Sequence, residues 1–211
     1  MPRFIPNWIK SKKSIRKNIR TIRTYQAIVI GVSSGGMEAM KTIFSALPAD
    51  FETPIVIVQH VSPRSDSQWI TMLNKNCQLQ IKEADEKEKI KNGVIYIAPP
   101  NYHLLIEKDH TFSLTVDEKV NYARPAIDVL FETAAVAFKN NLIGIVLTGA
   151  NHDGAAGLKM IKDCGGLCIV QDPKTAASPY MPQSAIALIE PDYILKLQDI
   201  IDLLISLDKI N

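Results

Sequence analysis

The chain of 211 residues lacks the long hydrophobic runs and cysteine clusters that define several protein classes. No stretch approaches the ~20 uncharged apolar residues that a membrane-spanning helix needs, and the N-terminus lacks the apolar core of a secretory signal. Internal repeats and low-complexity segments are also missing. These absences favour a single globular domain, which we predict to be cytoplasmic.

Cysteine is scarce, and its three positions form no cluster with metal-ligand spacing. An odd number of cysteines argues against a disulfide framework, so we expect three reduced thiols, with Cys164 and Cys168 packed in the core. The three residues are Cys77, Cys164 and Cys168.

Acidic residues are missing from residues 1–26, which carry eight Lys and Arg side chains. The rest of the chain holds 16 basic and 22 acidic side chains, so the body is acidic although the net charge is +2. We therefore divide the chain into a basic N-terminal tail or linker, residues 1–26, and a globular domain, residues 27–211. We interpret the tail as a solvated linker or arm. The alternative is binding to an anionic membrane surface or an acidic partner, which the shared helical face of Ile15, Ile19 and Ile22 would suit.

Short β-branched runs alternate with longer amphipathic segments along most of the body. This rhythm predicts parallel strands joined by crossover helices, and hence an α/β fold with a doubly wound, three-layer αβα architecture. Between residues 78 and 116 the spacing is too short for helices. There we expect a strand returning to the sheet and a β-hairpin that turns at residues 108–110. Elsewhere, strands are expected at 27–31, 54–59, 143–147, 167–171 and near 193–194, and helices at 37–47, 67–73, 125–138, 155–162, 182–189 and 197–207.

The stretch GVSSGG at residues 31–36 lies between the first expected strand and a helix-forming segment, and it satisfies G-x-S-x-G. Glycine tolerates the torsions of such a turn, which places a serine oxygen beside the unpaired amides of a helix N-terminus. The stretch alone leaves three interpretations open: a nucleophilic serine, a phosphate-binding loop of a nucleotide site, or a structural turn.

Three chemically matched side chains follow three of the expected strands. Ser33 follows the first strand, His60 the second, and Asp153 the strand at residues 143–147. Ligands of open α/β sheets bind beyond the carboxyl ends of the strands, so these residues are candidates for a Ser–His–Asp triad. Each also has a structural alternative: helix capping for Ser33 and Asp153, and an ordinary surface histidine for His60.

The order of Ser33, His60 and Asp153 along the chain, and the residues at the end of the second strand, narrow the choice of protein class. The order Ser, His, Asp differs from the Ser, Asp or Glu, His order of α/β-hydrolases. Gln59 and His60 occupy the position where a dinucleotide fold carries an acidic ribose ligand, and no Walker lysine is present. A triad outside the α/β-hydrolase family is therefore the favoured interpretation.

Five motifs in order resemble the catalytic domain of the chemotaxis protein-glutamate methylesterase, the CheB family. They are IGVSSGG at 30–36, VQHV at 58–61, YIAP at 96–99, RP at 124–125 with DVLF at 128–131, and VLTG at 146–149 with DGAAG at 153–157. QDP at 171–173 and MP at 181–182 also fit. The resemblance extends over about residues 28–204.

The resemblance implies a serine esterase with Ser33 as nucleophile, His60 as base and Asp153 as the carboxylate that orients the histidine. It implies hydrolysis of glutamate methyl esters on chemoreceptors in chemotaxis adaptation, with release of methanol, and the same chemistry allows glutamine deamidation. Neither a metal nor an organic cofactor is needed, and no nucleic acid is expected as a partner. Backbone amides at the oxyanion site are expected from Ser34, Gly35, Gly36 and Ala150.

The chain departs from the family pattern in two places. Ala150-Asn151-His152 stands where family members commonly have Met-Gly-Asn or Met-Gly-Ser. The family's usual N-terminal receiver domain is replaced by the basic tail, so we expect constitutive activity or control by a separate regulatory protein, and association with membrane-proximal arrays through the tail. The alternative to an enzyme is an inactive or nucleotide-binding regulatory α/β module. We expect His152 at the site rim, and His103 and His110 as ordinary strand or hairpin residues.

Overall fold

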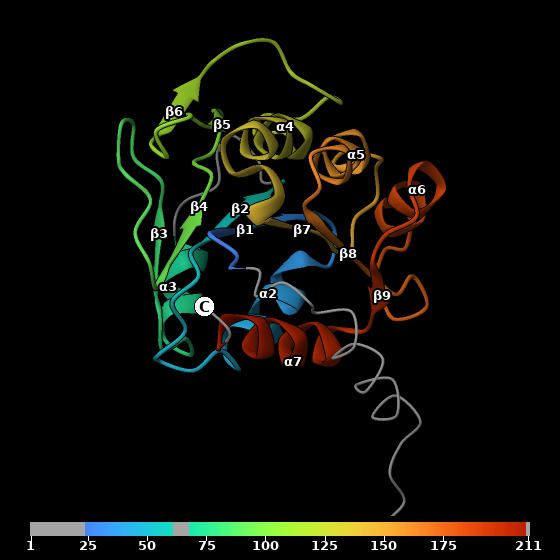
Figure 1. The fold of residues 1–211 in the computed structure, drawn as a ribbon, viewed down its shortest axis with the longest axis horizontal. Coiled ribbons are helices and arrows are strands. Elements are labelled where there is room, and N and C mark those ends of the chain that lie inside the picture. Colours follow the sequence, from blue (N-terminus) through green and yellow to red (C-terminus); the bar gives the residue numbers. More distant parts are fainter. Residues whose placement is uncertain (1–23, 61–67, 210–211) are drawn as a thin grey trace, which may run out of the picture.

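The computed structural model describes residues 24–60 and 68–209. Its centre is a seven-stranded sheet in the order β3-β4-β2-β1-β7-β8-β9, in which every pairing is parallel (Figure 1). A separate antiparallel hairpin pairs β5 with β6. The strands are β1 (Ala27–Val32), β2 (Ile55–Gln59), β3 (Gln80–Glu83), β4 (Val94–Ile97), β5 (His103–Ile106), β6 (Phe112–Thr115), β7 (Leu142–Val146), β8 (Leu167–Gln171) and β9 (Tyr193–Leu195).

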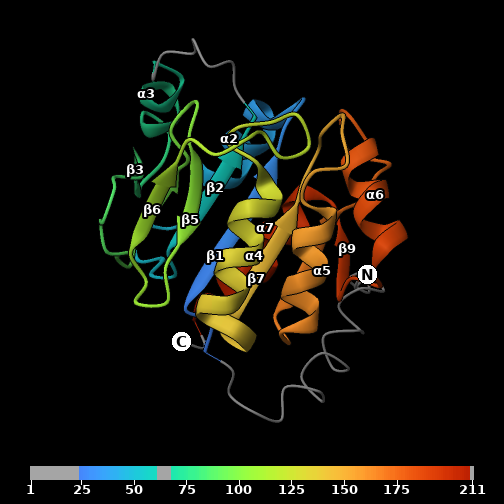
Figure 2. The ribbon, with the colours of Figure 1, turned by 90° about the horizontal axis from the view of Figure 1, so that it is seen from above.

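Helices cover both faces of the sheet, which confirms the predicted three-layer architecture (Figures 1 and 2). One face is covered by α2 (Gly36–Phe44), α3 (Gln68–Asn74) and α7 (Leu197–Asp208). The other face is covered by α4 (Ile127–Phe138), α5 (Ala155–Asp163) and α6 (Tyr180–Leu188), and a short 3-10 turn (Lys139–Asn141) joins α4 to β7.

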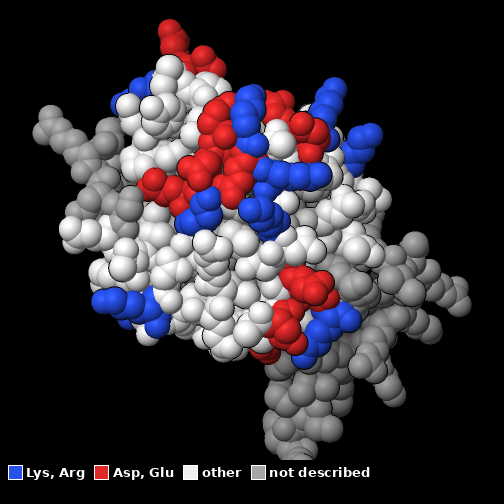
Figure 3. Space-filling view, turned by 90° about the vertical axis from the view of Figure 1, so that its left-hand side faces the viewer, with Lys and Arg blue, Asp and Glu red and all other residues white. Residues whose placement is uncertain are grey.

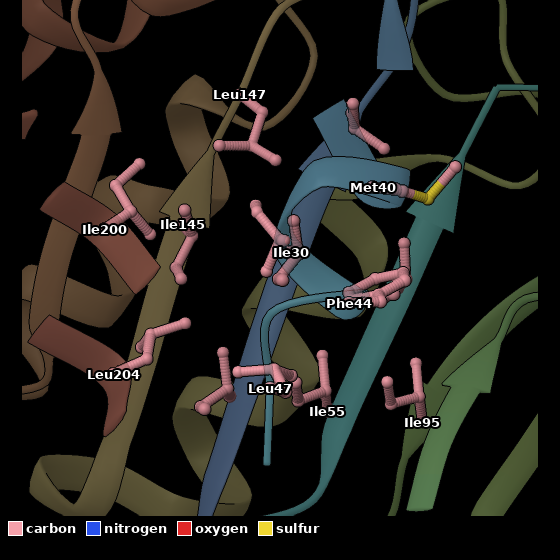
Figure 4. Packing of buried hydrophobic residues seen from close by; sticks show 14 of the residues in the cluster. Ile30, Met40, Phe44, Leu47, Ile55, Ile95, Ile145, Leu147, Ile200 and Leu204 are labelled. Atoms are coloured by element: carbon pink, nitrogen blue, oxygen red, sulfur yellow. The ribbon is translucent and has the colours of Figure 1, made fainter. Parts of the chain in front are cut away.

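The central strand β1 is buried over its whole length and divides the core into two halves. Successive side chains of a strand point to opposite faces, so Ile28 and Ile30 join Met40 and Phe44 of α2 on one side (Figure 4). Val29 joins the cluster of α4 and α5 on the other side. Burial on both faces explains why β1 is a continuous apolar run rather than an alternating one.

The region between residues 78 and 116 contributes two strands to the sheet, not the single returning strand that we expected. β3 and β4 both pair in parallel at the sheet edge. The side chain of Asn74 covers part of the exposed edge of β3, because it accepts from Ile81 N–H (2.9 Å) and donates to Ile81 C=O (2.7 Å). The predicted hairpin is present as β5 and β6, and Phe112 packs in the α4 side of the core.

Helix α4 begins later than the sequence predicts. The expected first helical residue, Pro125, lies outside the helix, which begins at Ile127 with Ala126 as its N-cap. The carboxylate of Asp153 accepts hydrogen bonds from the amides of Ile127 and Asp128, and this distant cap fixes the start of the helix. A cap supplied by another loop leaves no signal in the neighbouring sequence.

On the face shown in Figure 3, acidic side chains gather next to several Lys and Arg side chains. Lys82 forms ion pairs with Asp85 and Glu88, and Lys87 pairs with Glu86. Residues 1–23 of the predicted basic tail lie outside the described residues.

The described ranges contain no helix that is both long enough and apolar enough to cross a bilayer. All three cysteines are free, as predicted, and burial raises the pKa of the Cys168 thiol on β8 to about 12.

Candidate active site

The three predicted site residues lie together at the carboxyl ends of β1, β2 and β7. His60 Nδ1 lies 3.1 Å from Ser33 Oγ, and His60 Nε2 lies 2.8 Å from Asp153 Oδ2. Asp153 is fully buried, whereas 14% of the His60 side chain is exposed. The arrangement is therefore a continuous line of hydrogen bonds from an inner carboxylate to a serine at the surface.

Hydrogen bonds to the carboxylate of Asp153 fix its position and its charge. Oδ2 accepts from Ile127 N–H at 2.7 Å, and Oδ1 accepts from Asp128 N–H at 3.1 Å and from Asn121 Nδ2 at 2.8 Å. Burial acts to raise the pKa of this carboxyl, but the hydrogen bonds, led by that from His60, outweigh it and hold the pKa below its usual value. Asp153 is thus ionised and able to orient His60.

Asp153 is a helix cap, but of a different helix from the one that the sequence suggests. The sequence suggests it as the N-cap of α5, yet that position is held by Gly154. Its carboxylate caps α4 instead. Helix capping and bonding to His60 are therefore compatible roles, since the one carboxylate of Asp153 accepts from the α4 amides and also bonds to His60.

A second carboxylate, that of Asp128, lies beside the first. Its Oδ1 accepts from Gly154 N–H (2.9 Å) and Gly157 N–H (2.7 Å), and its Oδ2 accepts from Asn121 Nδ2 (2.7 Å). Burial raises the pKa of Asp128, the hydrogen bond from Gly157 opposes the shift, and the charge of Asp153 raises the pKa further.

The turn that carries Ser33 is held from behind by Thr148. The Thr148 carbonyl accepts from Ser33 N–H at 3.0 Å, and its hydroxyl donates to the Ser34 carbonyl at 2.8 Å. Gly35 is the N-cap of α2 with a φ of 80°, and a Cβ there would lie 2.6 Å from Ala177 Cβ. Neither Ser33 nor Ser34 caps α2 through its side chain, so the capping alternative for Ser33 is not observed.

The backbone amides expected at an oxyanion site differ in their availability. In the part of the chain that the structure describes, the amides of Ser34, Gly35 and Ala150 have no acceptor, and all three residues are exposed. The Gly36 amide instead donates to the Ser33 carbonyl at 2.8 Å. Gly36 therefore supports the turn, whereas the other three amides have no partner among the described residues.

Gln59 bonds to the backbone of both Ser33 and His60. Its Nε2 donates to the carbonyl oxygens of Ser33 (3.2 Å) and His60 (2.9 Å), and the residue is 8% exposed. A Cβ on Gly36 would lie 2.2 Å from Gln59 Oε1, so this packing requires glycine at position 36. The sequence indicated only that Gln59 was not a ribose-binding acid.

Asn151, a departure from the family pattern, also contacts His60. Its Nδ2 lies 3.3 Å from His60 Nδ1, and its Oδ1 accepts from Asp153 N–H at 3.2 Å. Sequence reasoning missed this contact, as it missed the bridge that Asn121 makes between the two carboxylates. Both asparagines lie in loops, and only the folded chain brings them to their partners.

The other histidines lie apart from the Ser33 to Asp153 line. His152 is exposed, as expected for a rim residue. His103 is buried on β5, where Nε2 donates to the Glu118 carbonyl at 3.0 Å and Nδ1 accepts from Ala126 N–H at 3.2 Å. His110, in the turn between β5 and β6, stacks on Phe138 of α4 with ring centroids 4.3 Å apart.

The parallel αβα sheet and the hydrogen-bonded Ser33, His60 and Asp153 are of the kind that serine hydrolases possess. The model of the CheB methylesterase family matches residues 28–204 of this chain. The protein therefore belongs to the CheB methylesterase family, and the resemblance seen in its motifs is confirmed.

Individual relatives agree with this assignment. A Leptospira interrogans protein, named for protein-glutamate methylesterase and protein-glutamine glutaminase activities, is 59% identical over 187 residues, which cover 89% of this chain and 97% of the relative. A relative from Archaeoglobus fulgidus named for the same activities is 37% identical over 164 residues, 76% of this chain and 47% of the relative. The crystal structure of the Thermotoga maritima CheB methylesterase catalytic domain superposes with a TM-score of 0.83 at 35% identity, covering 87% of this chain and 99% of that domain.

Proposed function

We propose that this chain is a protein-glutamate methylesterase that acts on methylated chemoreceptors, with Ser33 as its nucleophile. The observation that carries the assignment of residues is the hydrogen-bonded line from buried Asp153 through His60 to Ser33 Oγ. An ionised carboxylate at Nε2 holds the imidazole with its Nδ1 lone pair toward the serine, the orientation that a general base requires.

In this mechanism Ser33 Oγ attacks the side-chain ester carbonyl while its proton passes to His60 Nδ1. The tetrahedral oxyanion binds at the free amides of Ser34, Gly35 and Ala150, and each such donor typically lowers the barrier by about 3 kcal/mol. The intermediate collapses, the proton passes from His60 to the methoxy oxygen, and methanol leaves. Water then hydrolyses the acyl-serine with His60 again as base.

Glutamine is a second substrate in this proposal. Its side-chain amide presents the same carbonyl to Ser33, and ammonia replaces methanol as the leaving group. The names of the Leptospira and Archaeoglobus relatives carry both activities, which supports this pairing.

The nucleotide-binding alternative has no support in the site. The side chain at the end of β2, Gln59, is turned back onto the carbonyls of Ser33 and His60 instead of facing a ribose. The amides at the start of α2 lie beside a serine already bonded to His60.

We also propose that the basic segment, residues 1–26, brings the enzyme to anionic membranes near the receptors. The eight Lys and Arg side chains without an acidic residue support electrostatic binding. Full-length protein should sediment with vesicles containing anionic lipid, in a salt-sensitive way, whereas a variant that lacks residues 1–23 should not. Equal sedimentation of both proteins would overturn this part.

The catalytic proposal is tested by methanol release from receptor membranes that carry glutamate methyl esters. Ser33→Ala should abolish release and labelling by a fluorophosphonate, with no change in thermal unfolding. Ser34→Ala is the matched control, because it retains the backbone amide. Wild-type release by Ser33→Ala, or loss of activity only in Ser34→Ala, would refute the role given to Ser33.

A further inference from the structure

The side chain of Asn151 approaches the same nitrogen of His60, Nδ1, as the hydroxyl of Ser33. Its Oδ1 accepts from the Asp153 amide at 3.2 Å. Because a backbone N–H can only donate, this contact assigns the oxygen and directs Nδ2 toward His60 Nδ1, 3.3 Å away. The half-buried asparagine is therefore oriented by its own loop.

Two donors compete for one lone pair in the resting site. Ser33 Oγ (3.1 Å) and Asn151 Nδ2 (3.3 Å) both approach His60 Nδ1, while Nε2 donates its hydrogen to Asp153. A neutral imidazole has a single acceptor lone pair, in the plane of the ring. Both donors therefore lie on the side of the imidazole where the reacting atoms assemble.

Proton transfer reverses the role of this nitrogen. Once Nδ1 carries the proton of Ser33, it becomes a donor, and the Asn151 N–H loses its acceptor. The tetrahedral intermediate forms at Ser33 Oγ, on the same side of the imidazole, and brings oxygen atoms that can accept from Asn151. The oxygen that next takes the proton from Nδ1 is that of the leaving group.

We propose that Asn151 Nδ2 donates a hydrogen bond to the leaving-group oxygen and so makes the site selective for esters over amides. This inference rests on the proposed function of Ser33 and His60. As the bond between the carbonyl carbon and the methoxy oxygen breaks, one lone pair of that oxygen takes the proton from Nδ1 and the other accepts from Asn151. The products are methanol and the acyl-serine.

An amide substrate gains no such help from Asn151. The leaving nitrogen of the intermediate formed from glutamine has one lone pair, which must take the proton from His60 Nδ1. A hydrogen bond from Asn151 to that lone pair would block the transfer. The same donor that assists methanol release therefore gives no assistance to ammonia release.

Two variants separate this role from a structural one. Asn151→Ser keeps a side-chain oxygen for the Asp153 amide but is too short to reach His60, whereas Asn151→Ala removes both contacts. Both should lower kcat for glutamate methyl esters roughly tenfold with little change in KM, and change glutamine deamidation less than twofold. His152→Ala, at the exposed neighbouring position, should leave both rates unchanged.

The measurement is methanol and ammonia release by the full chain from receptor membranes whose modification sites carry either methyl esters or glutamine. As an additional substrate, a peptide bearing the p-nitrophenyl ester of glutamate should acylate Ser33 of Asn151→Ser at the wild-type rate, because nitrophenolate leaves without protonation. Equal losses on all substrates, or full ester activity in Asn151→Ser with loss only in Asn151→Ala, would overturn the inference. Failure of the proposed function is recognised separately, by Ser33→Ala retaining activity.

Discussion

Asp128 and Asp153 cap each other's helices. Asp153, in the loop before α5, accepts from the first amides of α4, and Asp128, in the first turn of α4, accepts from Gly154 and Gly157 at the start of α5. A single nitrogen, Asn121 Nδ2, donates to both carboxylates at 2.7 and 2.8 Å. The carboxylate that bonds to His60 is thus part of the contact between the N-termini of α4 and α5.

The two carboxylates should affect stability in opposite ways as the pH falls. The pKa of Asp153 is lower in the folded protein than in the unfolded chain, so its contribution is present above about pH 4 and is lost as the pH falls through the folded value. The pKa of Asp128 is raised, so the folded protein binds that proton first, and stability rises as the pH falls through the raised value toward about 4.

Urea unfolding of wild type, Asp153→Asn and Asp128→Asn over a pH series measures both effects. The free energy by which wild type is more stable than Asp153→Asn should shrink as the pH falls below about 4. In contrast, wild type should gain stability relative to Asp128→Asn as the pH falls from the raised pKa of Asp128 toward about 4. Slopes of the same sign for the two differences would contradict the assigned directions.

Removing the bridge between the carboxylates should slow catalysis. Asn121 has a φ of 51°, so Asn121→Gly deletes the side chain without straining the backbone. Loss of a charge-assisted hydrogen bond to Asp153 should lower kcat about tenfold at nearly constant KM in the methanol assay. Tyr122→Ala, at a neighbouring side chain that is 95% exposed, is the control and should match wild type in kcat. An unaltered kcat in Asn121→Gly would show that the bridge does not support catalysis.

Gln59→Met should separate the nucleophile from its base. The methionine has a similar length but no donor, so the carbonyls of Ser33 and His60 lose their shared hydrogen-bond partner. We expect about a tenfold lower kcat and an equally slower labelling of Ser33 by a fluorophosphonate. Gln183→Met, on the exposed surface of α6, should label at the wild-type rate. Normal labelling of Gln59→Met would argue against a positioning role.

The sheet was largely predictable because its strands are buried on both faces. Such strands are continuous β-branched runs, and β1, β2, β7 and β8 lie within one residue of their expected bounds. Parallel topology then places the carboxyl ends of β1, β2 and β7 at one edge of the sheet. Ser33, His60 and Asp153 could therefore be grouped from the sequence alone. The edge strand β3 was missed because Ile81 is its single buried residue.

The contacts around the triad residues were not predictable in the same way. Asn121, Asn151 and Gln59 bond to groups that distant segments bring to them, and short polar loops have no periodicity to indicate such partners. Asp153 illustrates the limit well. The sequence suggested that it caps a helix, but only the packing of α4 against α5 determines which helix it caps.

Thr148 binds the serine turn through both its backbone and its side chain, and is itself anchored, because its N–H donates to Gln171 Oε1 at 2.9 Å and its hydroxyl accepts from Ser178 N–H at 2.8 Å. Ser33 is therefore positioned by residues that follow the central strands of the folded sheet, and it needs no substrate to hold it in place. Binding free energy from the receptor need not be spent on ordering Ser33, and is available to distort and align the ester.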